Sequence, residues 1–244
     1  ITIPVALERD NSAFNWKRKR RVFEQSTLYV AAPSQWLLNK AKQSILASGT
    51  RGFHHIIHGV DTSVFRPADK ARCRSQLKLP QDTFVVLFAA NGIRKNRWKD
   101  FPTLIAAVRK ISTDVSNKNI LFVALGQDGQ QEDYGSAEIR FISYIANRNE
   151  VATYYAAANV YVHAARAETF PNAILEAMAA GIPVVASAVG GIPEQVTGFM
   201  EAGFPELNTR PLKQANGILV PPENSDALAD ALRWLLERPA IVEQ

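Results

Sequence analysis

The sequence predicts an α/β fold in which a Rossmann-like parallel sheet carries helices on both faces. Short continuous apolar runs recur from residue 84 onward, a pattern typical of strands that are buried on both faces. Segments with helical periodicity separate these runs. Because strands that alternate with helices build parallel sheets, both observations indicate the same fold class.

The six predicted strands of this sheet are Phe84–Ala90, Ile120–Leu125, Ile139–Tyr144, Val160–Val162, Pro183–Ala186 and Gly217–Val220. The predicted helices cover residues 101–113, 149–158, 171–180 and 224–238. In such sheets ligands bind beyond the carboxyl ends of the strands, so functional residues are expected in the loops that follow the strands.

The part of the chain before residue 84 is less regular. A strand is predicted at Leu28–Ala32, followed by a helix for which Ser34 is a candidate N-cap. Residues 56–67 combine a short apolar run with turn formers and are interpreted as a connection. Near the other end, residues 199–216 contain Gly and two prolines and are interpreted as a loop insertion.

Composition limits the partners without choosing one. The 244 residues include 28 Lys and Arg against 23 Asp and Glu, which gives a net charge of +5. This excess favours phosphates, nucleic acid or an anionic membrane surface. One cysteine, Cys73, excludes an internal disulfide and fits a reducing compartment. No apolar run approaches the length that spans a bilayer.

A basic run occupies residues 17–21. It has two interpretations, a solvated helix face or a patch that binds phosphate or a membrane. Because the chain begins at Ile1 rather than Met, in the middle of ordinary sequence, we expect it to be a piece of a longer protein.

The most informative stretch surrounds the predicted helix at 171–180. Pro171 suits the first turn of a helix and Gly181 suits the position after its end, which predicts a helix of about ten residues. Its N-terminus offers unpaired N–H groups and the positive end of the helix dipole, which together favour binding of an anion. Glu168 precedes the helix and Glu176 lies inside it. Two carboxylates beside an anion seat suit sugar hydroxyls, so the pattern indicates a nucleotide sugar.

A second cluster follows the strand at 84–90. Arg94, Lys95, Arg97 and Lys99 place four cations within six residues, and Gly92 permits a tight turn before them. Cations at the carboxyl end of a strand can neutralise a diphosphate. Alone, a solvated basic loop explains this cluster equally well, but together with the helix at 171–180 it favours a phosphate site.

At this point the sequence resembles the GT-B glycosyltransferases of family 4. Residues 159–191 are similar to the donor-site signature of that family, in which two glutamates are separated by seven residues, as Glu168 and Glu176 are. The resemblance extends to the linking segment at 58–67, the phosphate segment at 91–101, and the final strand and helix. The family commonly has Gly-Arg and Lys-Gly where this chain has Ile93-Arg94 and Lys99-Asp100, and Arg97 is an alternative to Arg94.

The resemblance implies specific roles for these residues. Glu168 would hold hydroxyls of the transferred sugar and Glu176 those of the ribose. Arg94 and Lys99 would bind the diphosphate, and Glu168, Lys99 and Arg94 are the candidate catalytic residues. Five further donor-binding candidates lie in the turns and at the start of the helix: Gly92, Thr169, Phe170, Pro171 and Asn172. The loop after Ile139–Tyr144 would meet the base.

The resemblance also implies the reaction. Members of the family transfer a sugar from a nucleotide diphosphate to an acceptor with retention of configuration, and they need no metal or other cofactor. Expected partners are a UDP- or GDP-sugar and a sugar or lipid-linked acceptor, with surface polysaccharide or lipopolysaccharide assembly as the suggested role. A cytoplasmic location is expected, with peripheral contact at the inner face of a membrane as a further expectation.

Other functions are less well supported by the residues. The four histidines form no metal-ligand set, and each is interpreted as a packed or surface residue. The four tryptophans are scattered, and neither a GxGxxG fingerprint nor a Walker A loop occurs, so no nucleic-acid partner, dehydrogenase or NTPase is predicted. Two alternatives remain, a nucleotide-sugar epimerase of the same architecture and a non-catalytic nucleotide-sugar-binding module.

The resemblance divides the chain into two domains. Residues 1–60 are predicted to be the end of an N-terminal acceptor domain and the bridge, and residues 61–244 the C-terminal donor half of a GT-B fold. The front of the acceptor domain is expected to be missing. We therefore expect the chain alone to bind a nucleotide sugar weakly without transferring the sugar.

Overall fold

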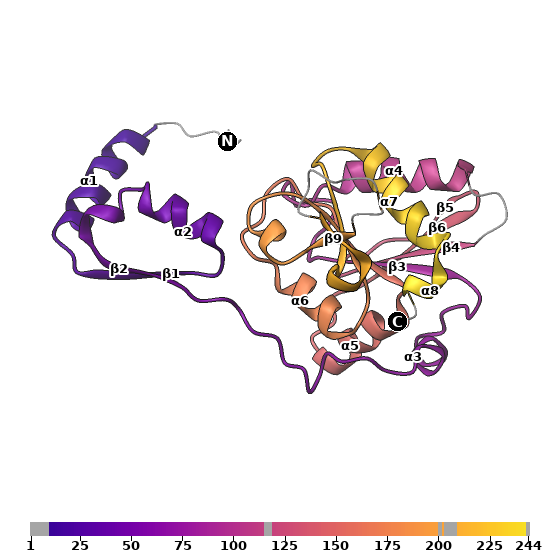
Figure 1. Cartoon of the computed structure of the whole chain (residues 1–244). Coiled ribbons are helices and arrows are strands. Elements are labelled where there is room, and N and C mark those ends of the chain that lie inside the picture. The colour runs from indigo at the N-terminus through magenta and orange to yellow at the C-terminus, as the bar shows by residue number, and fades with distance from the viewer. Residues whose placement is uncertain (1–9, 115–118, 200–201, 203–208, 243–244) are drawn as a thin grey trace. The chain divides into compact units, whose positions relative to one another are not determined.

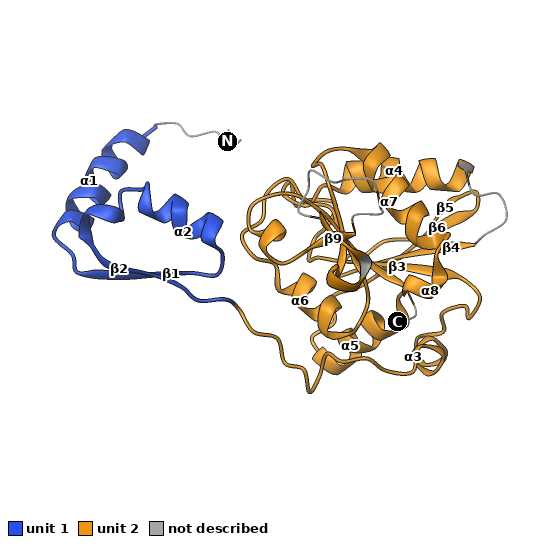
Figure 2. Ribbon diagram, viewed as in Figure 1, with its two compact units in different colours: residues 1–57 blue, residues 58–244 orange. Residues whose placement is uncertain are grey.

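Strands and helices alternate along the chain as the sequence predicts (Figure 1). The structure is a computed structural model, and it describes residues 10–114, 119–199, 202 and 209–242. The chain divides into two compact units, residues 1–57 and 58–244 (Figure 2). This division lies three residues before the predicted boundary at 60/61. The assignment of the units to acceptor and donor domains stays a prediction.

The second unit contains a nine-stranded sheet with the order β10-β9-β11-β8-β7-β3-β4-β6-β5. All its pairs are parallel except the edge pair β5–β6. The central strands are β3 (Phe84–Ala89), β4 (Ile120–Leu125), β6 (Ala137–Ile142), β7 (Val160–His163), β8 (Val184–Ser187) and β11 (Gly217–Val220). The two edge strands are β5 (Glu132–Tyr134) and β10 (Thr209–Arg210), and the short β9 (Gly198–Phe199) lies between β10 and β11. The predicted Rossmann-like parallel sheet is confirmed.

Helices cover both faces of this sheet. One face packs against α4 (Phe101–Asp114) and α7 (Ser225–Leu236), and the short α8 (Pro239–Val242) follows α7. The other face packs against α3 (Lys70–Leu77), α5 (Arg148–Ala157) and α6 (Asn172–Ala179). The predicted helices correspond to α4, α5, α6 and α7.

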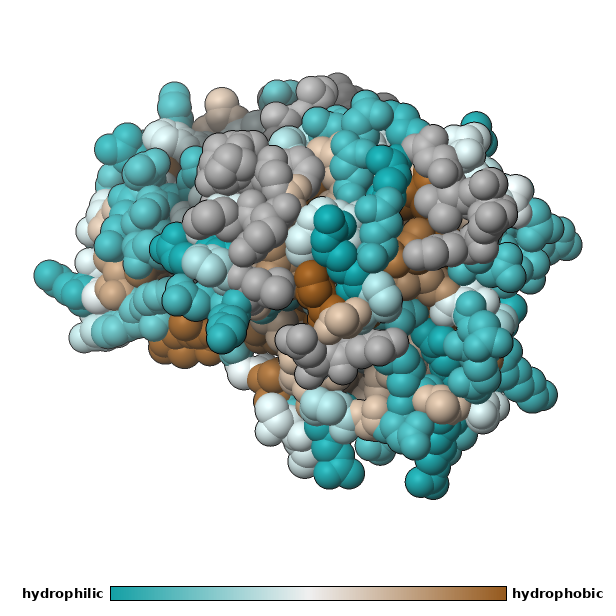
Figure 3. Space-filling model, turned by 45° about the vertical axis from the view of Figure 1, so that its right-hand side comes forward, coloured by the Kyte–Doolittle hydropathy of each residue, from teal (hydrophilic) through white to brown (hydrophobic). Residues whose placement is uncertain are grey.

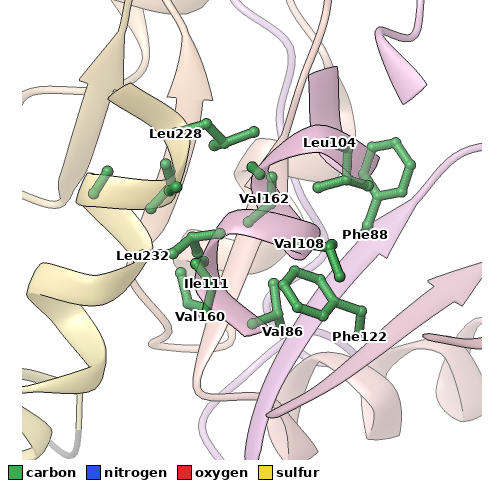
Figure 4. Close-up of a cluster of buried hydrophobic side chains, with 14 of the residues drawn as sticks. Val86, Phe88, Leu104, Val108, Ile111, Phe122, Val160, Val162, Leu228 and Leu232 are labelled. Atoms are coloured by element: carbon green, nitrogen blue, oxygen red, sulfur yellow. The ribbon is translucent and has the colours of Figure 1, made fainter. Parts of the chain in front are cut away.

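Strand β3 contributes to the core on both faces because successive side chains of a strand point in opposite directions. Val86 and Phe88 pack against α4 and α7, where Leu104 and Leu232 meet them (Figure 4). Leu87 belongs to the core on the other face. Each such fully buried apolar side chain stabilises the fold by about 1.5–3 kcal/mol. The continuous apolar run at 84–90 reflects this double burial.

The first unit contains α1 (Ser12–Glu24), β1 (Leu28–Ala32), α2 (Gln35–Lys42) and β2 (Thr50–His55), with β1 parallel to β2. The predicted N-cap is confirmed, because Ser34 Oγ accepts the N–H of Leu37 at 3.2 Å. The basic run at 17–21 lies on α1, which has no buried residue. Polar side chains cover most of the surface in Figure 3.

The sequence analysis does not predict several elements: α1, β2, α3 and β5. These elements are half-exposed or exposed, so their apolar residues follow no clear period. The predicted loop at 199–216 contains β10 and the short 3₁₀ helix Leu212–Gln214, whereas residues 200–201 and 203–208 lie outside the described part of the chain. None of the described helices combines the length and apolar character that a membrane span requires.

Candidate functional site

Most of the predicted site residues lie in loops that follow β3 and β7, two neighbours in the sheet, and Asn172 and Glu176 lie on α6. The loop after β3 carries Gly92, Arg94 and Lys99. The loop after β7 carries Glu168 and leads into α6. Because β3 and β7 are parallel, both loops leave the sheet at the same edge.

Backbone hydrogen bonds join the two loops. The N–H of Asp100 donates to Ala164 O at 3.1 Å, and the N–H of Arg166 donates to Trp98 O at 2.9 Å. Lys99 and Ala165 lie opposite each other between these bonds, as in an antiparallel bridge. This short ladder fixes the backbone of Lys99 beside the segment that leads to Glu168.

The side chains of Lys99 and Glu168 form an ion pair at the end of this ladder. Both are mostly buried, with side-chain exposures of 15% and 19%. Burial disfavours the charged carboxylate, but His163 and Lys99, whose side chains face it, together outweigh this effect. They lower the pKa of Glu168 to about 2. Glu168 is therefore an ionised acceptor at neutral pH.

A buried carboxylate, that of Asp100, also links the two loops. Asp100, with 1% of its surface exposed, accepts hydrogen bonds from Arg166 Nε at 3.3 Å and from Thr103 Oγ1 at 2.7 Å. Arg166 Nη2 lies 3.2 Å from the same carboxylate. This ion pair links the loop after β3 to the loop after β7.

We expect Arg166→Ala to lower the free energy of unfolding by about 2–3 kcal/mol. The substitution leaves the buried carboxylate of Asp100 with only the hydroxyl of Thr103, and an unpaired buried charge is costly. Chemical denaturation measures the change. In the double variant Asp100→Asn/Arg166→Ala the charge is also removed, so part of the stability should return. No recovery in the double variant would contradict this account.

A glycine allows the loop after β8 to pack closely against the backbone of Glu168. Gly190, in the loop after β8, has φ +58, and a Cβ there would lie 1.7 Å from the carbonyl oxygen of Glu168. The N–H of Gly191 donates to that oxygen at 3.4 Å. Ser187 Oγ, at the end of β8, accepts the N–H of Ala165 at 3.2 Å. The loops after β7 and β8 therefore hold each other in position.

Arg94 is directed elsewhere in this structure. Its guanidinium pairs with Glu132 on β5 and lies over the ring of Phe141 at 4.4 Å. Gly92 adopts φ +64, which supports the predicted tight turn. The structure thus brings Lys99, but not the guanidinium of Arg94, into contact with Glu168. The assignment of Arg94 to the diphosphate stays a prediction.

Helix α6 is shorter than predicted. It spans eight residues, so it is about 12 Å long, and Pro171 precedes it as the N-cap rather than lying in its first turn. Gly181 follows the C-cap with φ +77, as predicted. No side-chain hydrogen bond caps the N-terminus of α6, which leaves its dipole for an anion.

The candidate residues before α6 differ in exposure. Phe170 is buried, with His58 packed edge-on against its ring at 5.9 Å. His58 Nδ1 lies 3.0 Å from Asn172 Oδ1 at the start of the helix. The N–H of Thr169 lies 3.3 Å from Glu168 Oε2. These contacts place the backbone of Thr169–Asn172 between Glu168 and α6.

Buried aromatic side chains connect the two glutamates. Tyr155 Oη donates to Glu176 Oε2 at 3.0 Å, and its ring packs against Tyr161 with centroids 5.5 Å apart. Burial, followed by the charges of Glu176 and Glu168, raises the pKa of Tyr161 well above its ordinary value. Burial also raises the pKa of Glu176, against the Tyr155 hydrogen bond and the charge of Arg148.

Sequence reasoning missed His163 as part of the site. It is packed, with 1% exposure, as its interpretation as a packed or surface residue allows. However, its Nε2 atom lies 3.4 Å from Lys99 Nζ and 3.6 Å from Glu168 Oε1. Its position at the carboxyl end of β7 is the signal that could have found it.

Two further observations concern what surrounds the site. Within the described residues, no cluster of three His, Cys, Asp or Glu side chains is placed to hold a metal ion. A hollow of about 290 Å³ lies at the opposite edge of the sheet, lined in part by Gly181, Ile182 and Pro183 just before β8. None of the predicted site residues lines this hollow. The site is therefore identified by its residue types and their contacts, and not by the volume of a cavity.

Comparisons with known proteins identify the family of this chain. Residues 83–238 match the model of the family described as "Glycosyl transferases group 1". D-inositol 3-phosphate glycosyltransferase 1 from Catenulispora acidiphila is 31% identical over 230 residues, which cover 86% of this chain and 51% of that protein. A D-inositol 3-phosphate glycosyltransferase from Thermobifida fusca is 33% identical over 155 residues, 58% of this chain and 35% of that protein.

Solved structures give the same result for the fold. Sucrose-phosphate synthase from Thermosynechococcus elongatus superposes with a TM-score of 0.68 at 28% identity, covering 98% of this chain and 56% of that one. The Anabaena protein HepE, in complex with UDP and glucose, superposes with a TM-score of 0.67 at 20% identity, covering 95% and 59%.

The chain thus spans about half the length of the relatives that it matches. The family match covers the central strands, the loops that carry Lys99 and Glu168, and α6, which carries Glu176. The predicted GT-B relationship is confirmed, and this chain belongs to the glycosyl transferases group 1 family.

Proposed function

We propose that this chain carries the donor-binding half of a retaining glycosyltransferase that takes its sugar from a nucleotide diphosphate. The observation that supports this proposal most strongly is the contact between Lys99 and Glu168 at the strand ends, in the segment that leads to α6. It combines a cation, an ionised hydroxyl acceptor and a helix N-terminus, which are the groups that a diphosphate sugar requires.

The chemistry assigns Lys99 to the leaving group. When the bond between the sugar and the diphosphate breaks, negative charge accumulates on the diphosphate oxygens. The ammonium of Lys99 and the positive end of the α6 dipole are fixed before the reaction and stabilise that charge. Glu168 forms an ion pair with Lys99, so the donor would insert where this ion pair lies.

The two glutamates act as hydroxyl acceptors with different acid strengths. Glu168, whose pKa is about 2, stays ionised and would hold hydroxyls of the transferred sugar. Its negative charge also suits a sugar that develops positive charge in the transition state. Glu176, on α6, would hold the ribose. The proposal assigns no role to a metal ion in holding the sugar or the ribose.

The relatives suggest which ligands to try first. HepE is described in complex with UDP and glucose, so UDP-glucose is the first donor to test. The relatives described as D-inositol 3-phosphate glycosyltransferases make a phosphorylated polyol an acceptor to test beside sugar and lipid-linked acceptors. A role in surface polysaccharide assembly, a cytoplasmic location and peripheral membrane contact belong to the same proposal.

Binding and turnover test the proposal separately. Calorimetric titration of the 244-residue chain with UDP-, GDP- and ADP-sugars should give saturable binding to one of them. Absence of binding to all three classes would refute a donor site. Turnover with an acceptor, assayed with a complete acceptor domain, then distinguishes a transferase from an epimerase, which would change the donor without an acceptor. The anomeric configuration of the product tests retention.

We expect Glu176→Gln to weaken nucleoside diphosphate binding about tenfold, because a neutral amide accepts ribose hydroxyls less well than a carboxylate. In the unsubstituted chain the raised pKa of Glu176 adds a pH signature. Affinity should fall as the pH drops through that pKa and Glu176 takes up a proton. Titrations at a series of acidic to neutral pH values measure this fall, which should be smaller in Glu176→Gln. The same pH dependence in both proteins would remove Glu176 from the site.

A further inference from the structure

His163 is a buried polar residue that the proposed function does not use. It ends β7, and 1% of its surface is exposed. Its Nδ1 atom lies 2.9 Å from Tyr161 Oη, and its Nε2 atom lies 3.4 Å from Lys99 Nζ. The Tyr161 hydroxyl in turn lies 3.4 Å from Ala89 O, at the end of β3. These contacts connect the side chain of Lys99 to the backbone of the strand that precedes its loop.

The hydrogen bonds in this series have one consistent direction. An ammonium can only donate, so His163 Nε2 is the acceptor for Lys99. In a neutral ring the proton then lies on Nδ1, which donates to Tyr161 Oη. The hydroxyl hydrogen of Tyr161 is left for Ala89 O. In this arrangement each of the three hydrogen bonds has a donor and an acceptor.

The surroundings keep the ring neutral. Burial lowers the pKa of His163, Glu168 raises it and the charge of Lys99 lowers it; the net direction is downward. A neutral acceptor also suits the charge of the site. Lys99 and Glu168 already compensate each other, so a second carboxylate in place of His163 would leave a net negative charge that repels a diphosphate. The imidazole holds the ammonium without adding charge.

We propose that His163 is a positioning residue for Lys99, whose ammonium it holds through the unprotonated Nε2 atom. The inference rests on the proposed function, in which Lys99 binds the diphosphate and Glu168 binds hydroxyls of the sugar. An ammonium has three N–H donors. Glu168 and His163 accept two of them, and among the described residues the structure gives no third acceptor. The remaining donor is available to a phosphate oxygen, and His163 keeps the ammonium in place when sugar hydroxyls compete for Glu168.

The inference predicts an effect on the diphosphate and not on the rest of the nucleotide. The readout is the diphosphate preference, defined as the Kd for UMP divided by the Kd for UDP, measured by calorimetry on the 244-residue chain. If the chain prefers another base, the corresponding pair, GMP and GDP or AMP and ADP, is used. His163→Leu should reduce the diphosphate preference about fivefold, the scale of one hydrogen bond, and leave the Kd for UMP unchanged.

Matched variants separate positioning from packing. Lys99→Ala removes the group on which His163 acts, so His163→Leu added to Lys99→Ala should change the diphosphate preference less than about twofold. In His163→Gln the amide oxygen can accept from Lys99, so the preference should return to within about twofold of its original value. If His163→Leu keeps the full preference, or causes an equal loss with and without Lys99, the inference is wrong although the proposed function stands. If the unsubstituted chain binds none of the nucleotides, the proposed function itself fails.

A direct measurement covers the case in which His163→Leu does not fold. Nitrogen-15 NMR of the labelled chain at neutral pH distinguishes a protonated from an unprotonated ring nitrogen. The other three histidines of the chain are exposed, so the triple variant His54→Gln/His55→Gln/His58→Gln assigns the signals that remain to His163. We expect a protonated Nδ1 and an unprotonated Nε2. A protonated Nε2, alone or together with Nδ1, would overturn the inference.

Discussion

Lys99→Ala is expected to lower kcat about 10²–10³-fold. The substitution removes a fixed cation from the position where negative charge develops on the leaving diphosphate, and loss of one such group typically costs about 3–4 kcal/mol of transition-state stabilisation. The ion pair with Glu168 is largely shielded from water, so solvent does not replace the lost ammonium fully. Steady-state kinetics, assayed with a complete acceptor domain, measure the change.

Lys95→Ala is the matched control for this experiment. Lys95 is an exposed cation in the same loop, so its replacement removes the same charge without removing the contact to Glu168. We expect its kcat to change less than about threefold, because exposed charges are screened by salt and water. Equal losses in both variants would show that the loop contributes only a general positive field, and the specific role of Lys99 would then be abandoned.

Gly190→Ala is expected to lower the free energy of unfolding by at least about 3 kcal/mol. The new Cβ would lie 1.7 Å from the carbonyl oxygen of Glu168, so one of the two loops has to move. The left-handed φ of +58 adds strain for any residue with a side chain. Because the clash involves the backbone of Glu168, donor binding should be lost together with stability. Chemical denaturation and calorimetric titration measure the two effects.

Gly92→Ala distinguishes the steric clash from the backbone strain, the two causes of the instability expected in Gly190→Ala. Gly92 has φ +64, but a Cβ there would have no atom within 4 Å. Its replacement should therefore cost only the strain of the left-handed backbone, about 1–2 kcal/mol. A loss in Gly190→Ala no larger than that in Gly92→Ala would mean that the loops relax, and the close packing behind Glu168 would not be essential.

Periodicity predicts the sheet and its helices because the central strands are buried on both faces. The runs at 84–90 and 120–125 became β3 and β4 with shifts of at most one residue at their ends. Elements with few buried residues lack such an apolar pattern, and the sequence analysis did not predict them. Helix α1 has no buried residue, and β5 is a three-residue edge strand, so neither leaves an apolar pattern in the sequence.

Part of the candidate site could be predicted from the sequence, because charged residues follow the ends of predicted strands. Lys99 and Glu168 were singled out 69 residues apart and lie in contact. Arg94 was singled out by the same reasoning, yet its guanidinium pairs with Glu132, a residue on an edge strand that the sequence analysis does not predict. The direction of a long side chain depends on neighbours that spacing along the chain does not reveal.

The sequence by itself determined the fold class, the edge of the sheet that carries the site and the chemical types of the residues there. Only the tertiary structure decided that Lys99 and Glu168 form a buried ion pair, that Gly190 lies against the backbone of Glu168, and that His163 joins them. Apolar periodicity is a local property of a segment and can be read from the chain. Contacts among loops from different strands depend on distances set by the whole sheet.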